Sequence, residues 1–168
     1  MHPWGPWAEL LRWDDRRTPE EVLDLLGRVW SVRVRLPDQP RTIDFQGIGA
    51  AAASPEDLVS EDYASCQRLA ADARAAGELA LIVPSAALPG TNTIVLFGPR
   101  VLIPWELEPI DLDVDLAAAV TAERASGPLA VLPHVRWRGA PHAGLAAWQA
   151  GQPYVFLEPT PTAMTDGA

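Results

Sequence analysis

The stretch that decides the fold is Leu79-Ala80-Leu81-Ile82-Val83-Pro84-Ser85-Ala86-Ala87-Leu88-Pro89-Gly90-Thr91-Asn92-Thr93-Ile94-Val95-Leu96-Phe97. Short apolar runs bounded by proline and glycine are typical of buried strands. The pattern predicts two strands joined by a tight loop, with Ser85 at the end of the first. Loops on a rigid scaffold carry many binding and catalytic groups, whereas turn serines commonly bond only to local backbone. These residues alone favour a Ser85 that bonds only to local backbone.

Composition narrows the class of protein. The chain has 168 residues, enough for one domain with a real core, and a net charge of -9 from 13 basic and 22 acidic residues. An acidic chain argues against non-specific nucleic-acid binding and against binding to anionic membranes. Every basic residue is arginine, which excludes a Schiff-base or phosphate-loop lysine. There is no signal-peptide pattern and no run of membrane-spanning length, so we expect a cytoplasmic location.

Helix and strand patterns alternate along the chain, which predicts a mixed α/β fold. Thr18, Pro19 and Glu21 form a capping-box pattern that begins a helix, and Gly27 is expected to end it. No glycine-rich dinucleotide fingerprint and no phosphate loop are present. Helices are predicted at residues 7–13, 18–27, 61–76, 111–124 and 140–150, and residues 54–57 are predicted to start another brief helix. Strands are predicted at residues 29–36, 42–45, 79–83, 93–97 and 154–157.

Glu9 and a basic cluster are candidate functional groups, each with an alternative. Glu9 lies among Trp7, Leu10 and Trp13, where desolvation would perturb its acidity, or it is an exposed first-turn glutamate favoured by the helix dipole. The cluster either binds an anion or is a solvated strand edge and helix start, which is the favoured interpretation. The histidine spacing fits no common metal site. The cluster consists of His134, Arg136, Arg138 and His142.

Two nucleophile hypotheses are disfavoured. Cys66 is the single cysteine, which excludes an intrachain disulfide and a cysteine-based zinc site, and on a helix it is expected to be a small buried apolar group. Ser85 stands between Pro84 and Ala86, whereas a nucleophile elbow needs glycine on both sides of the serine.

Several segments, in this order, resemble RES-domain proteins. Trp7-Ala8-Glu9-Leu10-Leu11-Arg12 is similar to their aromatic-Ala-Glu segment, and Arg41-Thr42-Ile43-Asp44-Phe45 to a Val-Leu-Asp-Leu strand. Residues 57–77 resemble their helix with a Cys-Gln pair, here Cys66-Gln67. Residues 84–97 resemble their Pro-Ser-Ala loop and the strand after it. The resemblance covers residues 7–98.

The resemblance implies a fold like that of ADP-ribosyltransferases, with small central β-sheets flanked by helices. RES proteins are toxins of bacterial toxin–antitoxin pairs that degrade NAD+ by phosphorolysis or hydrolysis of the nicotinamide–ribose bond. It implies NAD+ as substrate, phosphate as co-substrate of phosphorolysis, no cofactor or metal, and a helix-turn-helix (Xre-type) antitoxin, with a homo-oligomer left open. The implied catalytic residues are Glu9 and Ser85, and the implied substrate-binding residues are Tyr63, Gln67 and Asn92.

One departure bears on activity. RES proteins carry an arginine on a Gly-Gly-Arg-aromatic-Asn segment before the glutamate, and the eight residues before Glu9 contain no such motif. The start is then wrongly assigned, the chain is a degenerate, non-catalytic RES-like module that binds a nucleotide or a protein, or another arginine substitutes. We favour an enzyme. The candidate substitutes are Arg12, Arg33, Arg35, Arg136 and Arg138.

The expected organisation is a RES-like domain at residues 1–105, N-terminally truncated relative to the family. A C-terminal extension packed on the same domain is expected at residues 106–158. The Pro/Thr-rich residues 159–168 are expected to be a disordered tail.

Overall fold

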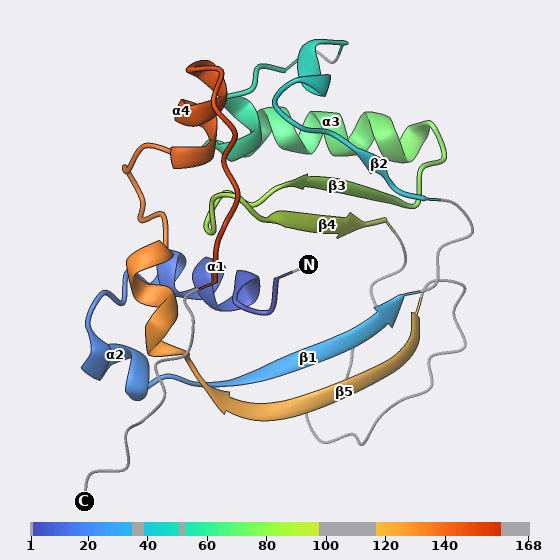
Figure 1. Cartoon of the computed structure of the whole chain (residues 1–168). Helices are drawn as coiled ribbons and strands as arrows, with labels where there is room; N and C mark the ends of the chain where they lie inside the picture. Colours follow the sequence, from blue (N-terminus) through green and yellow to red (C-terminus); the bar gives the residue numbers. More distant parts are fainter. Residues whose placement is uncertain (1, 35–38, 51–52, 98–116, 159–168) are drawn as a thin grey trace, which may run out of the picture.

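The computed structural model describes residues 2–34, 39–50, 53–97 and 117–158. Strands β2 (Arg41–Thr42), β3 (Ala80–Pro84) and β4 (Asn92–Leu96) form a three-stranded sheet, with β2 parallel and β4 antiparallel to β3. Strands β1 (Leu26–Val34) and β5 (Ala117–Ser126) pair antiparallel as a separate ribbon. The described part of the chain is a mixed α/β fold, as predicted (Figure 1).

Helices flank the three-stranded sheet. In Figure 1, α3 (Ala64–Ala75) runs along one side of it, and α1 (Gly5–Asp14) lies between it and the β1–β5 ribbon. Gly77 has a φ of 85° just past α3, the left-handed conformation that glycine adopts without strain. The other elements are α2 (Pro19–Leu23), α4 (Ala143–Gln149) and the 3₁₀ turns η1 (Gly47–Ala50), η2 (Asp57–Val59) and η3 (Leu129–His134).

Two apolar clusters form the core, and both reach the segment around Ser85. The first joins α1, α2 and η3 to the loop after β3, through Ala8, Leu11, Val22, Ala87, Leu88, Val131 and Val135. The second joins β3 to α3, η2 and the segment after β2, through Ile43, Ile48, Leu58, Val59, Ala73 and Leu81. Full burial of one such aliphatic side chain contributes about 1.5–3 kcal/mol. The loop after β3 is therefore held by packing against α1.

The predicted capping box at the start of α2 is confirmed. The Thr18 hydroxyl accepts from the Glu21 N–H at 3.3 Å, and the Glu21 carboxylate accepts from the Thr18 N–H at 3.0 Å. Helix α2 ends at Leu23 rather than at Gly27, which lies in β1, so that prediction was wrong. The helix has only five residues because the chain enters β1 at Leu26, where it begins to pair with β5.

Thr18→Ala is expected to lower the free energy of unfolding by about 1 kcal/mol, because the Glu21 N–H loses its acceptor. Urea denaturation would measure the change. Thr18→Ser keeps the hydroxyl and serves as the control. Equal midpoints for the alanine and serine variants would contradict this role of the hydroxyl.

The largest correction concerns the predicted helix at residues 111–124. Residues 117–126 form β5, which pairs with β1 from Leu26 opposite Ser126 to Val34 opposite Ala117, with a register shift between Arg33 and Val34. Residues 111–116 lie outside the described part. Alanine's helix preference amounts to less than about 1 kcal/mol per residue. Pairing along a nine-residue strand supplies main-chain hydrogen bonds that the segment's own sequence does not reveal.

Two predicted strands were also wrong in part or whole. The strand at 42–45 ends at Thr42, because the Asp44 carboxylate accepts from the Gln46 and Gly47 N–H groups at 3.0 and 2.6 Å and turns the chain. Residues 154–157 form no strand, although the Phe156 N–H donates to the Gly90 carbonyl at 3.3 Å. We call residues 152–158 the strap, since in Figure 1 they cross from α4 past the loop after β3.

Candidate active site

The loop after β3 is held by hydrogen bonds that start at Ser85. Its N–H donates to the Thr91 carbonyl at 2.9 Å, and its hydroxyl oxygen accepts from the Leu88 N–H at 3.1 Å. Ser85 is 1% exposed. The serine at the end of a core strand is confirmed, and its hydroxyl shapes the loop from within.

Glu9 of α1 faces this loop. Burial raises the pKa of the Glu9 carboxyl above its usual value of 4.5, and Arg12, the Ala87 N–H that bonds to it and Arg136 partly oppose that rise. The desolvated interpretation of Glu9 is therefore the one the structure supports. The groups that oppose the rise are two arginines and a loop amide two residues beyond Ser85, so Glu9 lies against the loop that carries Ser85.

Arg12 lies one helical turn after Glu9 and is 2% exposed. Its Nη2 lies 3.7 Å from Oε1 of Glu61, while its Nε and Nη1 are buried without a hydrogen-bond partner. Such unpaired donors cost free energy, which an anion accepting from them would recover. Arg12 is thus a cation beside Glu9 with unused hydrogen-bonding capacity.

Arg136 approaches the same place from the C-terminal part of the chain. Its Nε donates to the Ala140 carbonyl at 2.9 Å, and its Nη1 donates to the carbonyls of Val59 at 2.7 Å and Ala86 at 3.3 Å. Burial, and then Arg12, lower its pKa, against the opposing effect of Glu61 and Glu9. Arg12 and Arg136 are therefore both close enough to Glu9 to lower the pKa of its carboxyl.

His142 is buried and caps α4. Its Nδ1 accepts from the Leu145 N–H at 3.0 Å, and its Nε2 lies 3.0 Å from the Ser85 carbonyl oxygen. Burial lowers the pKa of the imidazole below 6.5; the hydrogen bond with Ser85 opposes this, and Arg136 and Arg12 add to it. The ring is therefore neutral at physiological pH.

The prediction of a helix start in the basic cluster is confirmed, because His142 caps α4, but the prediction that the cluster is solvated was wrong for Arg136 and His142. Val131 and Val135 are buried in the core, and they draw this segment inward. His134 packs edge-on against Phe156, with ring centroids 5.2 Å apart. Only Arg138 keeps a largely exposed side chain, at 53%.

The three predicted substrate-binding residues lie in different places. Tyr63 stacks on Trp13 with ring centroids 6.0 Å apart, and it is close enough to Arg136 to raise the pKa of that guanidinium. Gln67 is exposed on α3. Asn92, at the start of β4, lines a separate hollow of 450 Å³ together with His2 and Thr91. The structure thus places Tyr63 near Arg136, and Asn92 beside another hollow.

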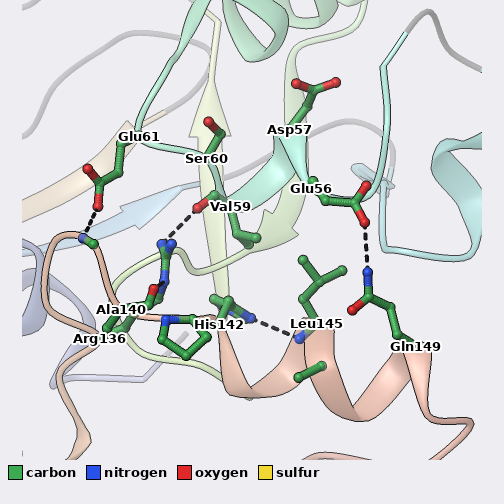
Figure 2. A pocket seen from close by; sticks show the side chains of 13 residues that line it. Glu56, Asp57, Val59, Ser60, Glu61, Arg136, Ala140, His142, Leu145 and Gln149 are labelled. Carbon is green, nitrogen blue, oxygen red and sulfur yellow. Dashed lines mark hydrogen bonds between the residues drawn. The ribbon is translucent and has the colours of Figure 1, made fainter.

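A hollow of 610 Å³ opens beside Arg136 and His142 (Figure 2). One wall is the segment from η2 to Glu61, and the other is the turn at residues 139–142 with α4. Hydrogen bonds join the walls at both ends: Gln149 to Glu56 at 2.7 Å, and the Gly139 N–H to Glu61 at 2.6 Å. Arg136 therefore lies at an open hollow whose two walls come from different parts of the chain.

Other chemistries find less support. Burial and Asp57 raise the pKa of Cys66, whose thiol donates to the Asp57 carbonyl at 3.1 Å, so it is not an activated thiolate. Among the described residues, no group of three or more His, Cys, Asp or Glu side chains is placed to hold a metal ion. No helix in the described ranges is long and apolar enough to span a bilayer.

The fold is mixed α/β, and its partly desolvated Glu9 lies against the loop that begins at Ser85. The RES domain family model matches residues 7–115, and the chain belongs to that family. A relative from Mycobacterium tuberculosis (strain ATCC 25618 / H37Rv), "Probable NAD(+) phosphorylase Rv3189", is 40% identical over 97 residues. That match covers 55% of this chain and 44% of the relative, so it spans less than half the length of the relative. No solved structure matches significantly.

Proposed function

We propose that this chain degrades NAD+ by cleaving the bond between nicotinamide and ribose. The observation that carries the proposal is the half-buried Glu9, whose carboxylate bonds to the Ala87 N–H of the Ser85 loop between Arg12 and Arg136. Membership of the RES family and a relative named as a probable NAD(+) phosphorylase support it.

The chemistry suits these groups. When the bond from ribose C1 to the nicotinamide nitrogen breaks, its electron pair leaves with neutral nicotinamide, and positive charge develops on the ribose. A preorganised carboxylate such as Glu9 stabilises that charge in a poorly solvated site. The new bond to C1 comes from a phosphate oxygen, giving ADP-ribose 1-phosphate, or from water, giving ADP-ribose and a proton.

The remaining residues have supporting roles in this proposal. Arg12 and Arg136 supply positive charge for the phosphate groups of NAD+ or for inorganic phosphate. Ser85, whose hydroxyl holds the Leu88 N–H, positions the loop amides against Glu9. Tyr63, Gln67 and Asn92 are proposed as substrate-binding residues, with Tyr63 the one placed near Arg136. The reaction needs no cofactor.

We further propose a cytoplasmic toxin held by a helix-turn-helix antitoxin, following the family resemblance. Expression of this chain alone is expected to arrest growth, and co-expression with a helix-turn-helix antitoxin that binds it is expected to restore growth. Growth arrest that persists in a Glu9→Gln strain would separate toxicity from NAD+ consumption and contradict the toxin mechanism.

The direct test incubates purified protein with NAD+, with and without inorganic phosphate, and measures released nicotinamide by chromatography. We expect release, with ADP-ribose 1-phosphate as product if phosphate is the acceptor. Ser85→Ala is expected to lower the rate about tenfold, because the buried Leu88 N–H loses its acceptor and the loop shifts.

Ser65→Ala, in the first turn of α3, is the control and is expected to keep the wild-type rate. Absence of nicotinamide release under conditions where Rv3189 is active would overturn the enzymatic proposal. Calorimetric binding of NAD+ without turnover would then assign the chain as a non-catalytic nucleotide-binding module.

A further inference from the structure

The peptide groups of the Ser85 loop are held by a segment that lies outside the family-matched residues 7–115. Three consecutive carbonyls of the loop take partners from residues 136–142: Ser85 from His142, Ala86 from the Arg136 side chain and Ala87 from the Arg136 N–H. The last of these bonds is 2.8 Å long. The orientation of the loop peptides is therefore set jointly by both parts of the chain.

His142 contacts the Ser85 carbonyl of the loop, and the position of its ring proton follows from its two hydrogen-bond partners. Nδ1 accepts a hydrogen bond from the Leu145 N–H, so Nδ1 carries no proton. The proton of the neutral ring is then on Nε2, which donates to the Ser85 carbonyl. A single imidazole thus links the first turn of α4 to Ser85.

The surroundings keep the ring in this place. The Phe45 ring meets it edge-on, with centroids 5.7 Å apart. A Cβ at Gly144 would lie 3.1 Å from Cε1 of His142, so glycine leaves the space that the imidazole occupies. His142 is 5% exposed, and both ring nitrogens lie 3.0 Å from protein hydrogen-bond partners.

We propose that His142, in its neutral Nε2–H form, is a positioning residue that aligns the Ser85 loop with Glu9. Arg136 anchors the same loop at the next two carbonyls. The C-terminal segment is therefore part of the active site, although the residues that carry the family resemblance precede it. The expected effect on kcat rests on the proposed NAD+ cleavage. The expected effect on the loop rests only on the hydrogen bonds described above.

Two substitutions distinguish the role of Nδ1 from that of Nε2. His142→Asn keeps an acceptor near the Nδ1 position for the Leu145 N–H but removes the donor to Ser85. His142→Gln places an N–H near the Nε2 position but lacks the short-range cap acceptor. Gly144→Ala keeps the histidine and displaces the ring by steric contact.

For the kinetic arm we expect His142→Asn to lower kcat for nicotinamide release about tenfold, with little change in KM. His142→Gln should recover most of that loss even though α4 is less well capped, and Gly144→Ala should fall between them. Equal losses in the asparagine and glutamine variants, or none in either, would overturn the positioning role.

The structural arm needs no activity. Nitrogen-15 NMR of the wild-type ring should show a protonated Nε2 and an unprotonated Nδ1. Amide exchange at Leu88 and Ser85 should accelerate in His142→Asn but not in His142→Gln, and exchange at Leu145 should show the opposite pattern. A protonated Nδ1, or unchanged loop exchange in His142→Asn, would reject the inference even if NAD+ is cleaved. Wild-type protein that gives the expected spectra without nicotinamide release would reject the proposed function alone.

Discussion

Glu9→Gln is expected to reduce NAD+ consumption by roughly 100- to 1000-fold, the usual cost of removing a preorganised charge that stabilises a transition state. Glutamine has nearly the same shape and can still accept from the Ala87 N–H, so the loop should remain in place. The measurement is the rate of nicotinamide release under saturating NAD+. Glu20→Gln, an exposed change on α2, is the control and should retain the wild-type rate.

The same substitution is expected to stabilise the fold at neutral pH. Burial raises the pKa of Glu9, so ionising this carboxyl costs more in the folded than in the unfolded chain. The gain should be absent below the ordinary value of 4.5, grow as the pH rises through the raised pKa, and stay constant above it. Thermal unfolding of both proteins across this pH range would measure it. An equally stable Glu9→Gln variant at pH 7 would show that Glu9 is solvated.

Gly90→Ala should destabilise the protein severely, by at least the roughly 1–3 kcal/mol of a strained backbone conformation. Gly90 has a φ of 84°, and a Cβ there would overlap the backbone nitrogen of Phe156 in the strap. Both the loop and the strap would have to move, because the closest atom belongs to backbone. Urea denaturation measures the loss, and the hydrogen bond from Phe156 to Gly90 should be lost with it.

Gly77→Ala is the matched control. Gly77 has nearly the same φ, 85°, but a Cβ there would meet nothing within 4 Å. It should therefore show only the conformational cost, and the difference between the two variants measures the contact with the strap. Equal destabilisation in both would contradict the close packing of strap and loop.

Local features of the sequence predicted much of the fold. The capping box at Thr18, the glycine after α3 and the apolar runs around Ser85 all act within a few residues, so their effects are visible in sequence. The strand at residues 117–126 was missed because its partner, β1, lies about ninety residues earlier, and pairing overrode alanine's weak helix preference.

Some residues of the candidate site could likewise be predicted from the sequence, and others could not. Glu9 and Ser85 were predicted from the family resemblance, and Arg12 was named as a substitute arginine but not ranked. Its spacing of three residues from Glu9 on a helix was the available signal, since residues so spaced share a face. For Arg136 and His142 the signal was weaker: Val131 and Val135 are spaced as on one buried helical face, which argued against a solvated segment.

The sequence by itself determined the strand–loop unit around Ser85, the helix that carries Glu9 and the caps that begin and end helices, because these depend on near neighbours along the chain. Only the tertiary structure decided that Ala87 meets Glu9, that Arg12 is buried with unpaired donors, and that Arg136 and His142 bind three successive loop carbonyls. The contact between His142 and Ser85 alone joins residues 57 positions apart. These contacts form because burying Leu11, Leu88 and Val135 in one core brings the polar groups beside them together.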